Sequence, residues 1–122
     1  MIKLYGPKVP RYSFGKDEKT GKMVSFELDG FNVNAKTLGE ALKLYEEKYN
    51  IKITPYESQI AEIQLDPNDE PKYFWFEDVE FPERSCVVDV HILRFDDDMC
   101  VKQKLNFPLN NGDIISIGPL SC

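Results

Sequence analysis

The sequence predicts an α+β fold in which several strands pack against one main helix. One segment carries the apolar stripe of an amphipathic helix, and several others alternate apolar and polar residues with the period of a strand. The chain has 122 residues, enough for one hydrophobic core but not for two. We therefore expect residues 1–122 to form a single domain, with an inserted or extended β-hairpin region.

The N-terminal third contains two predicted strands. Residues 2–5 alternate in polarity, as a strand with one buried face does. Two prolines cannot donate ladder hydrogen bonds, so residues 7–14 should run irregularly or along an edge, and the polar residues 15–21 should form a turn. Residues 22–31 alternate again, and we expect this second strand to return antiparallel to the first.

The clearest element is a helix that begins at Leu38. Thr37 and Glu40 have the spacing of a capping box, in which side chains bind the free backbone N–H groups of the first turn. Asn50 suits the C-terminal stop, where left-handed geometry is needed. One face is apolar and should pack on the sheet; it consists of Leu38, Ala41, Leu42, Tyr45 and Tyr49.

The remaining residues predict further strands. Short strands are expected at 51–54 and 60–65, and a loop at 66–71. Residues 86–95 and 99–107 read as a hairpin joined by Asp96, Asp97 and Asp98, and residues 113–120 read as a closing strand after an Asn-Gly turn.

The composition limits the partners and the cellular location that we expect. The net charge of −6 disfavours nucleic acid and anionic membrane as partners, because both attract basic surfaces. No apolar run approaches the length of a membrane span, so a soluble protein is expected. Three cysteines match no zinc or haem spacing and follow no apolar signal, which favours reduced thiols and a cytoplasmic location.

The order of elements resembles the β-grasp fold of ubiquitin-like proteins, and the end of the chain resembles the sulfur carriers of that fold. "NNGDIISIGPLSC" follows the carriers' closing pattern through Leu120, and then has Ser121 and Cys122 where the carriers have Gly-Gly. The resemblance implies a mixed sheet gripping one main helix. Activation as a thiocarboxylate is not expected, because a side chain on the last residue would obstruct the narrow adenylation pocket.

A second resemblance is to the N-terminal domain of the lambda-type phage tail-tip assembly protein I family. The matching residues are Leu4-Tyr5-Gly6, Thr37 with Glu40-Ala41-Leu42, and Gly112-Asp113 through Pro119. This resemblance implies a small non-enzymatic phage protein that binds a phage structural protein, in the host cytoplasm or the virion. A phage inhibitor of a host defence enzyme, acting through an acidic surface, is the alternative, and a sulfur-carrier relative is a more distant one.

The sequence offers little for catalysis. His91 is the only histidine; Asp89 is close enough to orient it, but a half-buried strand histidine is the commoner outcome. Three successive aspartates at 96–98 lack the alternating spacing of a calcium loop. We expect no catalytic, cofactor-binding or metal-binding residues, and therefore a chain that is not an enzyme.

An aromatic run is the predicted protein-binding site. Aromatic rings are enriched in binding hot spots, and acidic residues flank this run as a polar rim would. Since adjacent strand residues face opposite sides, the rings cannot all share one face, and the same rings could instead fill the core. The run consists of Tyr73, Phe74, Trp75, Phe76 and Phe81.

Overall fold

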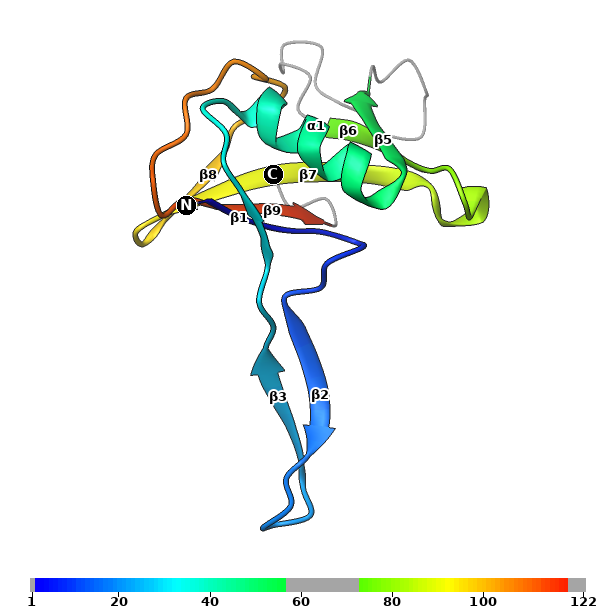
Figure 1. The fold of residues 1–122 in the computed structure, drawn as a ribbon, viewed down its shortest axis with the longest axis vertical. Helices are drawn as coiled ribbons and strands as arrows, with labels where there is room; N and C mark the ends of the chain where they lie inside the picture. The colour runs from blue at the N-terminus through cyan, green and yellow to red at the C-terminus, as the bar shows by residue number, and fades with distance from the viewer. Residues whose placement is uncertain (1, 57–72, 119–122) are drawn as a thin grey trace, which may run out of the picture.

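The computed structural model describes residues 2–56 and 73–118. One helix lies on one face of a curled mixed sheet, and a two-stranded hairpin projects from the sheet on the other side (Figure 1). The predicted α+β class, with a mixed sheet packed on one main helix and an extended hairpin, is confirmed. The strand and loop expected at 60–65 and 66–71 lie outside the described residues, as does Cys122.

The sheet has the strand order β4-β1-β9-β7-β6-β5, with β8 paired to β7. Strands β1 and β9 run parallel, and the other described neighbours in this sheet run antiparallel. The strands span Ile2–Tyr5 (β1), Phe31–Val33 (β4), Ile51–Pro55 (β5), Tyr73–Asp78 (β6), Cys86–Arg94 (β7), Asp97–Cys100 (β8) and Ile114–Gly118 (β9). A short 3₁₀ helix, η1 (Pro82–Arg84), connects β6 to β7.

Helix α1 spans Leu38–Tyr49, as the sequence predicts. The Thr37 hydroxyl accepts a hydrogen bond from the Glu40 N–H at 3.3 Å, and the Glu40 carboxylate accepts one from the Lys36 N–H at 2.8 Å. Asn50 ends the helix in the left-handed region, with φ 54° and ψ 55°. Local signals therefore determine both ends of this helix.

The core lies between α1 and the covered face of the sheet. In the strands of this sheet, alternate residues point to this face, as the period of a strand requires. Buried side chains from the helix, the central strands and β6 fill the space, among them Leu4, Leu42, Tyr45, Phe74, Phe76, Val90 and Ile115. No described helix is long and apolar enough to cross a lipid bilayer.

The N-terminal strands differ from the prediction. Strands β2 (Tyr12–Lys16) and β3 (Met23–Glu27) pair only with each other and form the projecting hairpin. The strand that returns antiparallel to β1 is β4, which follows the turn at Gly30. The expectation that β3 would pair with β1 is therefore wrong, because an alternating pattern does not specify which strand becomes the neighbour.

The last hairpin is shorter than expected. The turn between β7 and β8 consists of Phe95 and Asp96, so Arg94 faces Asp97 and the second arm ends at Cys100. The strand expected over 99–107 is wrong beyond that point, where Lys102 has a positive φ of 55° and the chain turns. In this segment the Gln103 side-chain amide donates hydrogen bonds to the backbone carbonyls of Tyr56 and Tyr73, at 3.1 and 2.7 Å.

Candidate protein-binding surfaces

The projecting hairpin is the most conspicuous surface feature of the described chain. We call residues 11–28 the arm. Figure 1 shows the arm extending away from the sheet, on the side opposite α1. Its strands expose an unusual set of large apolar side chains, namely Tyr12, Phe14, Met23, Val24 and Phe26. A two-stranded ribbon without a covering layer is marginally stable in water, and clustered exposed apolar side chains mark interaction sites.

The register of the arm divides its side chains between two faces. Tyr12 pairs with Glu27, Phe14 with Ser25, and Lys16 with Met23, and directly opposed residues point to the same side. We call this side the Phe14 face: Tyr12, Phe14, Lys16, Met23, Ser25 and Glu27. The opposite side is the Phe26 face: Ser13, Gly15, Val24 and Phe26.

The two faces of the arm differ in how exposed their aromatic rings are. On the Phe26 face, the ring of Phe26 lies over Gly15, where an added Cβ would come within 3.0 Å of it. On the Phe14 face, the Phe14 side chain is 71% exposed. The Phe14 face therefore offers the more accessible apolar surface.

The base of the arm is fastened to the sheet. The Arg11 guanidinium lies 5.5 Å from the ring centroids of both Tyr5 and Tyr12, and its Nε is 3.4 Å from a Glu27 carboxylate oxygen. The Tyr5 hydroxyl donates to the Leu28 carbonyl at 3.2 Å, and the Leu28 N–H donates to the Arg11 carbonyl at 2.7 Å. These contacts set the direction in which the arm leaves the sheet.

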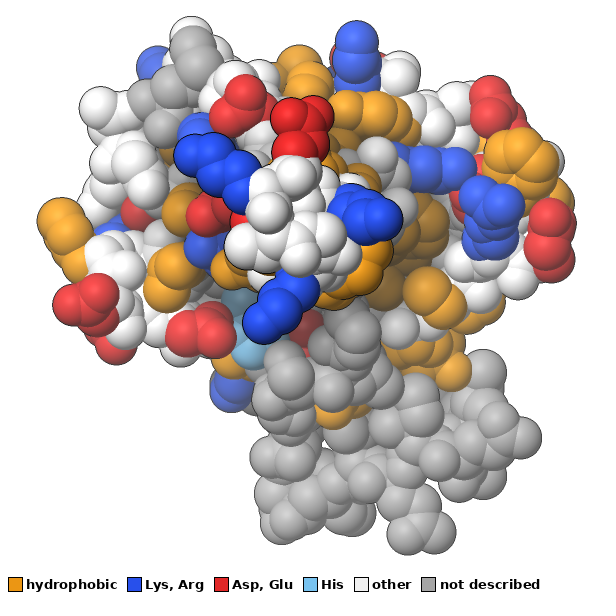
Figure 2. Space-filling view, turned by 90° about the horizontal axis from the view of Figure 1, so that it is seen from below, with side chains coloured by type: hydrophobic (Ala, Val, Ile, Leu, Met, Phe, Trp, Pro, Cys, Tyr) orange, Lys and Arg blue, Asp and Glu red, His pale blue; other side chains and the backbone are white. Residues whose placement is uncertain are grey.

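The tip of the arm is an ordered turn. The Asp17 carboxylate accepts hydrogen bonds from the Lys19 N–H at 2.9 Å and from the Thr20 hydroxyl at 3.1 Å. Gly21 has a φ of +68°, a conformation that favours glycine. Figure 2, seen from below, shows basic side chains on several sides of the arm. Both ends of the arm are therefore preformed, which lowers the entropic cost of binding.

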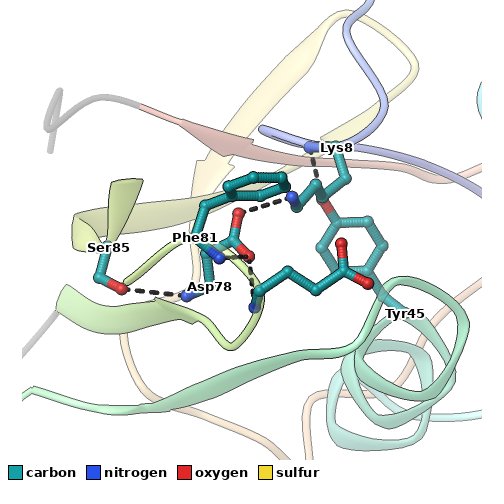
Figure 3. A network of polar contacts seen from close by, with 6 residues as sticks. Lys8, Tyr45, Asp78, Phe81 and Ser85 are labelled. Carbon is teal, nitrogen blue, oxygen red and sulfur yellow. Dashed lines mark hydrogen bonds and ion pairs between the residues drawn. The ribbon is translucent and has the colours of Figure 1, made fainter. Parts of the chain in front are cut away.

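A polar network holds the segment that leads into the arm (Figure 3). The Lys8 ammonium lies 2.5 Å from the buried Asp78 carboxylate, whose other oxygen accepts hydrogen bonds from the backbone N–H groups of Glu80 and Phe81. The Lys8 backbone N–H donates to the Tyr45 hydroxyl at 3.0 Å. The Lys8 contact holds the pKa of Asp78 below its usual range, and burial raises the pKa of Tyr45 to about 12.

The structure separates the aromatic run that the sequence singled out. Tyr73, Phe74 and Phe76 are buried, and Phe74 and Phe76 belong to the core beneath α1. Trp75 is 36% exposed on the other face of the sheet, where it stacks on Tyr56 with ring centroids 6.3 Å apart. Phe81 is also exposed, although Lys8 and Arg84 lie 5.4 and 4.7 Å from its ring centroid. Only Trp75 and Phe81 of the run are accessible to a partner, and their role in binding stays a prediction.

The histidine lies between two carboxylates. His91 Nε2 is 3.1 Å from Asp89, and Nδ1 is 2.9 Å from Asp98. Ser116 is the cross-strand neighbour of His91, but both ring nitrogens already face carboxylates, so neither is placed to take a proton from this serine. Among the described residues, no group of three or more His, Cys, Asp or Glu is arranged to hold a metal ion.

The "GD" of the closing motif has a structural role here. The Asp113 carboxylate is buried and accepts hydrogen bonds from Arg94 Nε at 3.1 Å, Arg94 Nη2 at 2.8 Å and the Asn110 N–H at 2.8 Å. Burial alone would raise the pKa of Asp113, but these donors outweigh that effect and lower it. Gly112 supplies the positive φ, +93°, that brings Asp113 into place. The motif thus fixes the start of β9 to the end of β7.

The cysteines only partly follow expectation. Cys86 is a free thiol, as expected, and partial burial raises its pKa. Cys100 is disulfide-bonded, however, and the expectation of reduced thiols is wrong for this residue. The expectation of a cytoplasmic location rested partly on reduced cysteines, and Cys100 does not support it.

Comparison of the chain with protein-family models, with curated proteins and with solved structures finds no match. The β-grasp and phage resemblances therefore stay predictions. The surface geometry carries the functional argument.

Proposed function

We propose that this chain is a non-enzymatic protein-binding module and that the arm is its principal binding element. One observation carries the proposal: the arm exposes five large apolar side chains, and none of residues 11–28 belongs to the buried core. Exposing so much apolar surface is unfavourable in water, and a partner that covers it recovers that free energy.

A protein partner fits the arm better than a nucleic acid does. Lysines and aromatic rings on a ribbon can bind a nucleic-acid strand when a strong positive field accompanies the stacking. The arm has four basic and three acidic residues, so its net charge is only slightly positive. Apolar side chains interleaved with charges of both signs are typical of a protein interface.

The biological setting is a further part of the proposal. The resemblance to tail-tip assembly proteins supports a role in phage tail assembly, with a virion protein as partner. The alternative, inhibition of a host enzyme through an acidic surface, would use the rest of the chain, where acidic residues outnumber basic ones. Binding through the arm should depend weakly on salt, whereas occlusion of a basic enzyme should depend on it strongly.

Site-specific photo-crosslinking tests the proposal. A photoreactive phenylalanine analogue is placed at position 14 or, as a matched control, at position 95, where the native side chain is 95% exposed but lies outside the arm. We expect a defined protein to crosslink at position 14 and not at position 95, and the purified partner to bind wild type directly. No crosslink at position 14, or the same set of proteins at both positions, would rule out the arm as the binding element.

A further inference from the structure

The Phe14 face is complementary to itself. From base to tip it presents Glu27 beside Tyr12, then the exposed ring of Phe14, then Lys16 beside Met23. A negative charge thus lies one row of side chains towards the base, and a positive charge one row towards the tip, from the row that holds Phe14. The Glu27 side chain is 51% exposed and remains accessible although it contacts Arg11.

We propose that the arm binds the arm of a second copy of this chain, face to face and antiparallel, about a two-fold axis that passes beside Phe14. This inference rests on the proposed function, since it takes the arm as the binding element and names its partner. In this arrangement the two Phe14 rings meet at the axis, and at each end the Lys16–Met23 pair of one copy lies over the Tyr12–Glu27 pair of the other. Lys16 then lies over Tyr12, with Glu27 beside that ring and within reach of the long lysine side chain. Met23 of each copy lies diagonally from Tyr12 of the other, within reach of a favourable contact between sulfur and an aromatic ring.

Charge selects the antiparallel arrangement. A parallel stack would bring the two Lys16 side chains into one row and the two Glu27 side chains into another, which is repulsive at both ends. The antiparallel stack converts both repulsions into attractions. A two-fold interface makes every contact away from its axis twice, so the pairs at the two ends count double.

The other face of the arm does not offer the same match. Its paired positions are Ser13 with Phe26 and Gly15 with Val24, and none of these four side chains is charged. The Phe26 ring already covers Gly15. The complementarity therefore belongs to the Phe14 face alone.

The interface is small. It involves six residues from each copy, whereas a stable interface of standard size uses about 20–30 residues a side. We therefore expect a dissociation constant in the micromolar range or weaker, and a dimer that forms as the concentration rises.

Sedimentation over a concentration series from about 1 µM to 1 mM measures this equilibrium. All variants carry Cys86→Ser, because Cys86 is free and exposed and could link copies covalently. We expect the mass of the reference protein to rise from the monomer value of 14.1 kDa towards twice that value. Phe14→Ser should weaken association at least ten-fold, while the matched control Val24→Ser on the Phe26 face should change it less than three-fold.

A charge swap tests the antiparallel pairing. Lys16→Glu should weaken the dimer about ten-fold at low salt, because it places two carboxylates together at each end. The double variant Lys16→Glu with Glu27→Lys should restore association to within about three-fold. Circular dichroism and the urea midpoint of each variant show whether it is folded, and a destabilised arm would not be rescued by the second substitution.

The outcomes separate this inference from the proposed function. A reference protein that stays monomeric at 1 mM, or a charge swap that fails to restore association, overturns the dimer. If position 14 nevertheless crosslinks to a different protein, the arm remains a binding element with another partner. If neither association nor crosslinking is found, both proposals fail.

Discussion

Two identical substitutions at phenylalanines of opposite exposure test whether the arm lies outside the core. Phe74 is 0% exposed beneath α1, whereas Phe14 is 71% exposed on the arm. Truncating a buried phenylalanine to alanine costs about 3–5 kcal/mol, through lost transfer free energy and the cavity that remains. Less than a third of the surface of Phe14 is buried, so Phe14→Ala should lower the free energy of unfolding by less than about 1 kcal/mol.

Urea unfolding, followed by circular dichroism and by the fluorescence of Trp75, measures the difference. A chain of this length is expected to have a stability of about 6–18 kcal/mol, so Phe74→Ala should remain folded in water. With a slope of about 2 kcal/mol per molar urea, its midpoint should fall by about 2 M, and that of Phe14→Ala by less than about 0.5 M. Samples are kept near 1 µM, so that association does not contribute.

The refuting result is specific. If Phe14→Ala costs more than about 2 kcal/mol at this concentration, the Phe14 ring is packed inside the monomer, and the arm is not a free surface. Equal losses for the two variants would remove the basis of both functional proposals.

Three further predictions concern the contacts that hold the body together. Tyr45→Phe removes the acceptor of the Lys8 N–H and should lower the free energy of unfolding by about 1–3 kcal/mol, measured by urea unfolding at pH 7 with Tyr12→Phe on the arm as control. The lowered pKa of Asp113 stabilises the fold above the unfolded value of about 4, and this contribution is lost as the pH falls through the folded value. Asp113→Asn should therefore be less stable at pH 7 and show a smaller loss between pH 5 and pH 2; an unchanged acid profile would contradict this role. Asn50→Gly should be neutral or slightly stabilising, whereas Asn50→Val should cost about 1–2 kcal/mol in thermal unfolding, because φ is 54° there.

The sequence predicts α1 well because its signals are local. The capping residue Thr37, the apolar stripe and the left-handed Asn50 lie within one segment, and each acts on the backbone next to it. Strands β1 and β5 are predicted for the same reason, since alternation is also a local pattern.

Strand pairing could not be predicted, because it depends on contacts between distant residues. Val24 and Phe26 alternate as though one face were buried in a core, but both are exposed on the arm. An alternating pattern shows that one face of a strand is apolar, but it does not show which part of the protein covers that face. The turn at Phe95 is a similar case, since its φ of 57° is uncommon for an aromatic residue and carries no sequence signature.

The candidate site was missed for a related reason. The rings of the aromatic run are adjacent in sequence, but the fold places Phe74 in the core and Trp75 on the opposite face of the sheet. The exposed side chains of the arm are distributed over two strands and come together only through the β2–β3 register. The prolines that interrupt residues 7–14 were the available signal, because they limit pairing of this segment with the main sheet.

The position of the arm in the chain also bears on how such a protein can diversify. The arm lies between β1 and β4, which pair directly with each other, as Leu4 and Phe31 do. It is therefore an insertion in the loop of a hairpin that closes without it, and none of its residues belongs to the buried core. Changes confined to residues 12–26 leave the contacts of Arg11 and Leu28 with Tyr5 in place, so they should cost little in folding. On the proposed function, such changes would alter what is recognised, and recognition and stability could evolve separately.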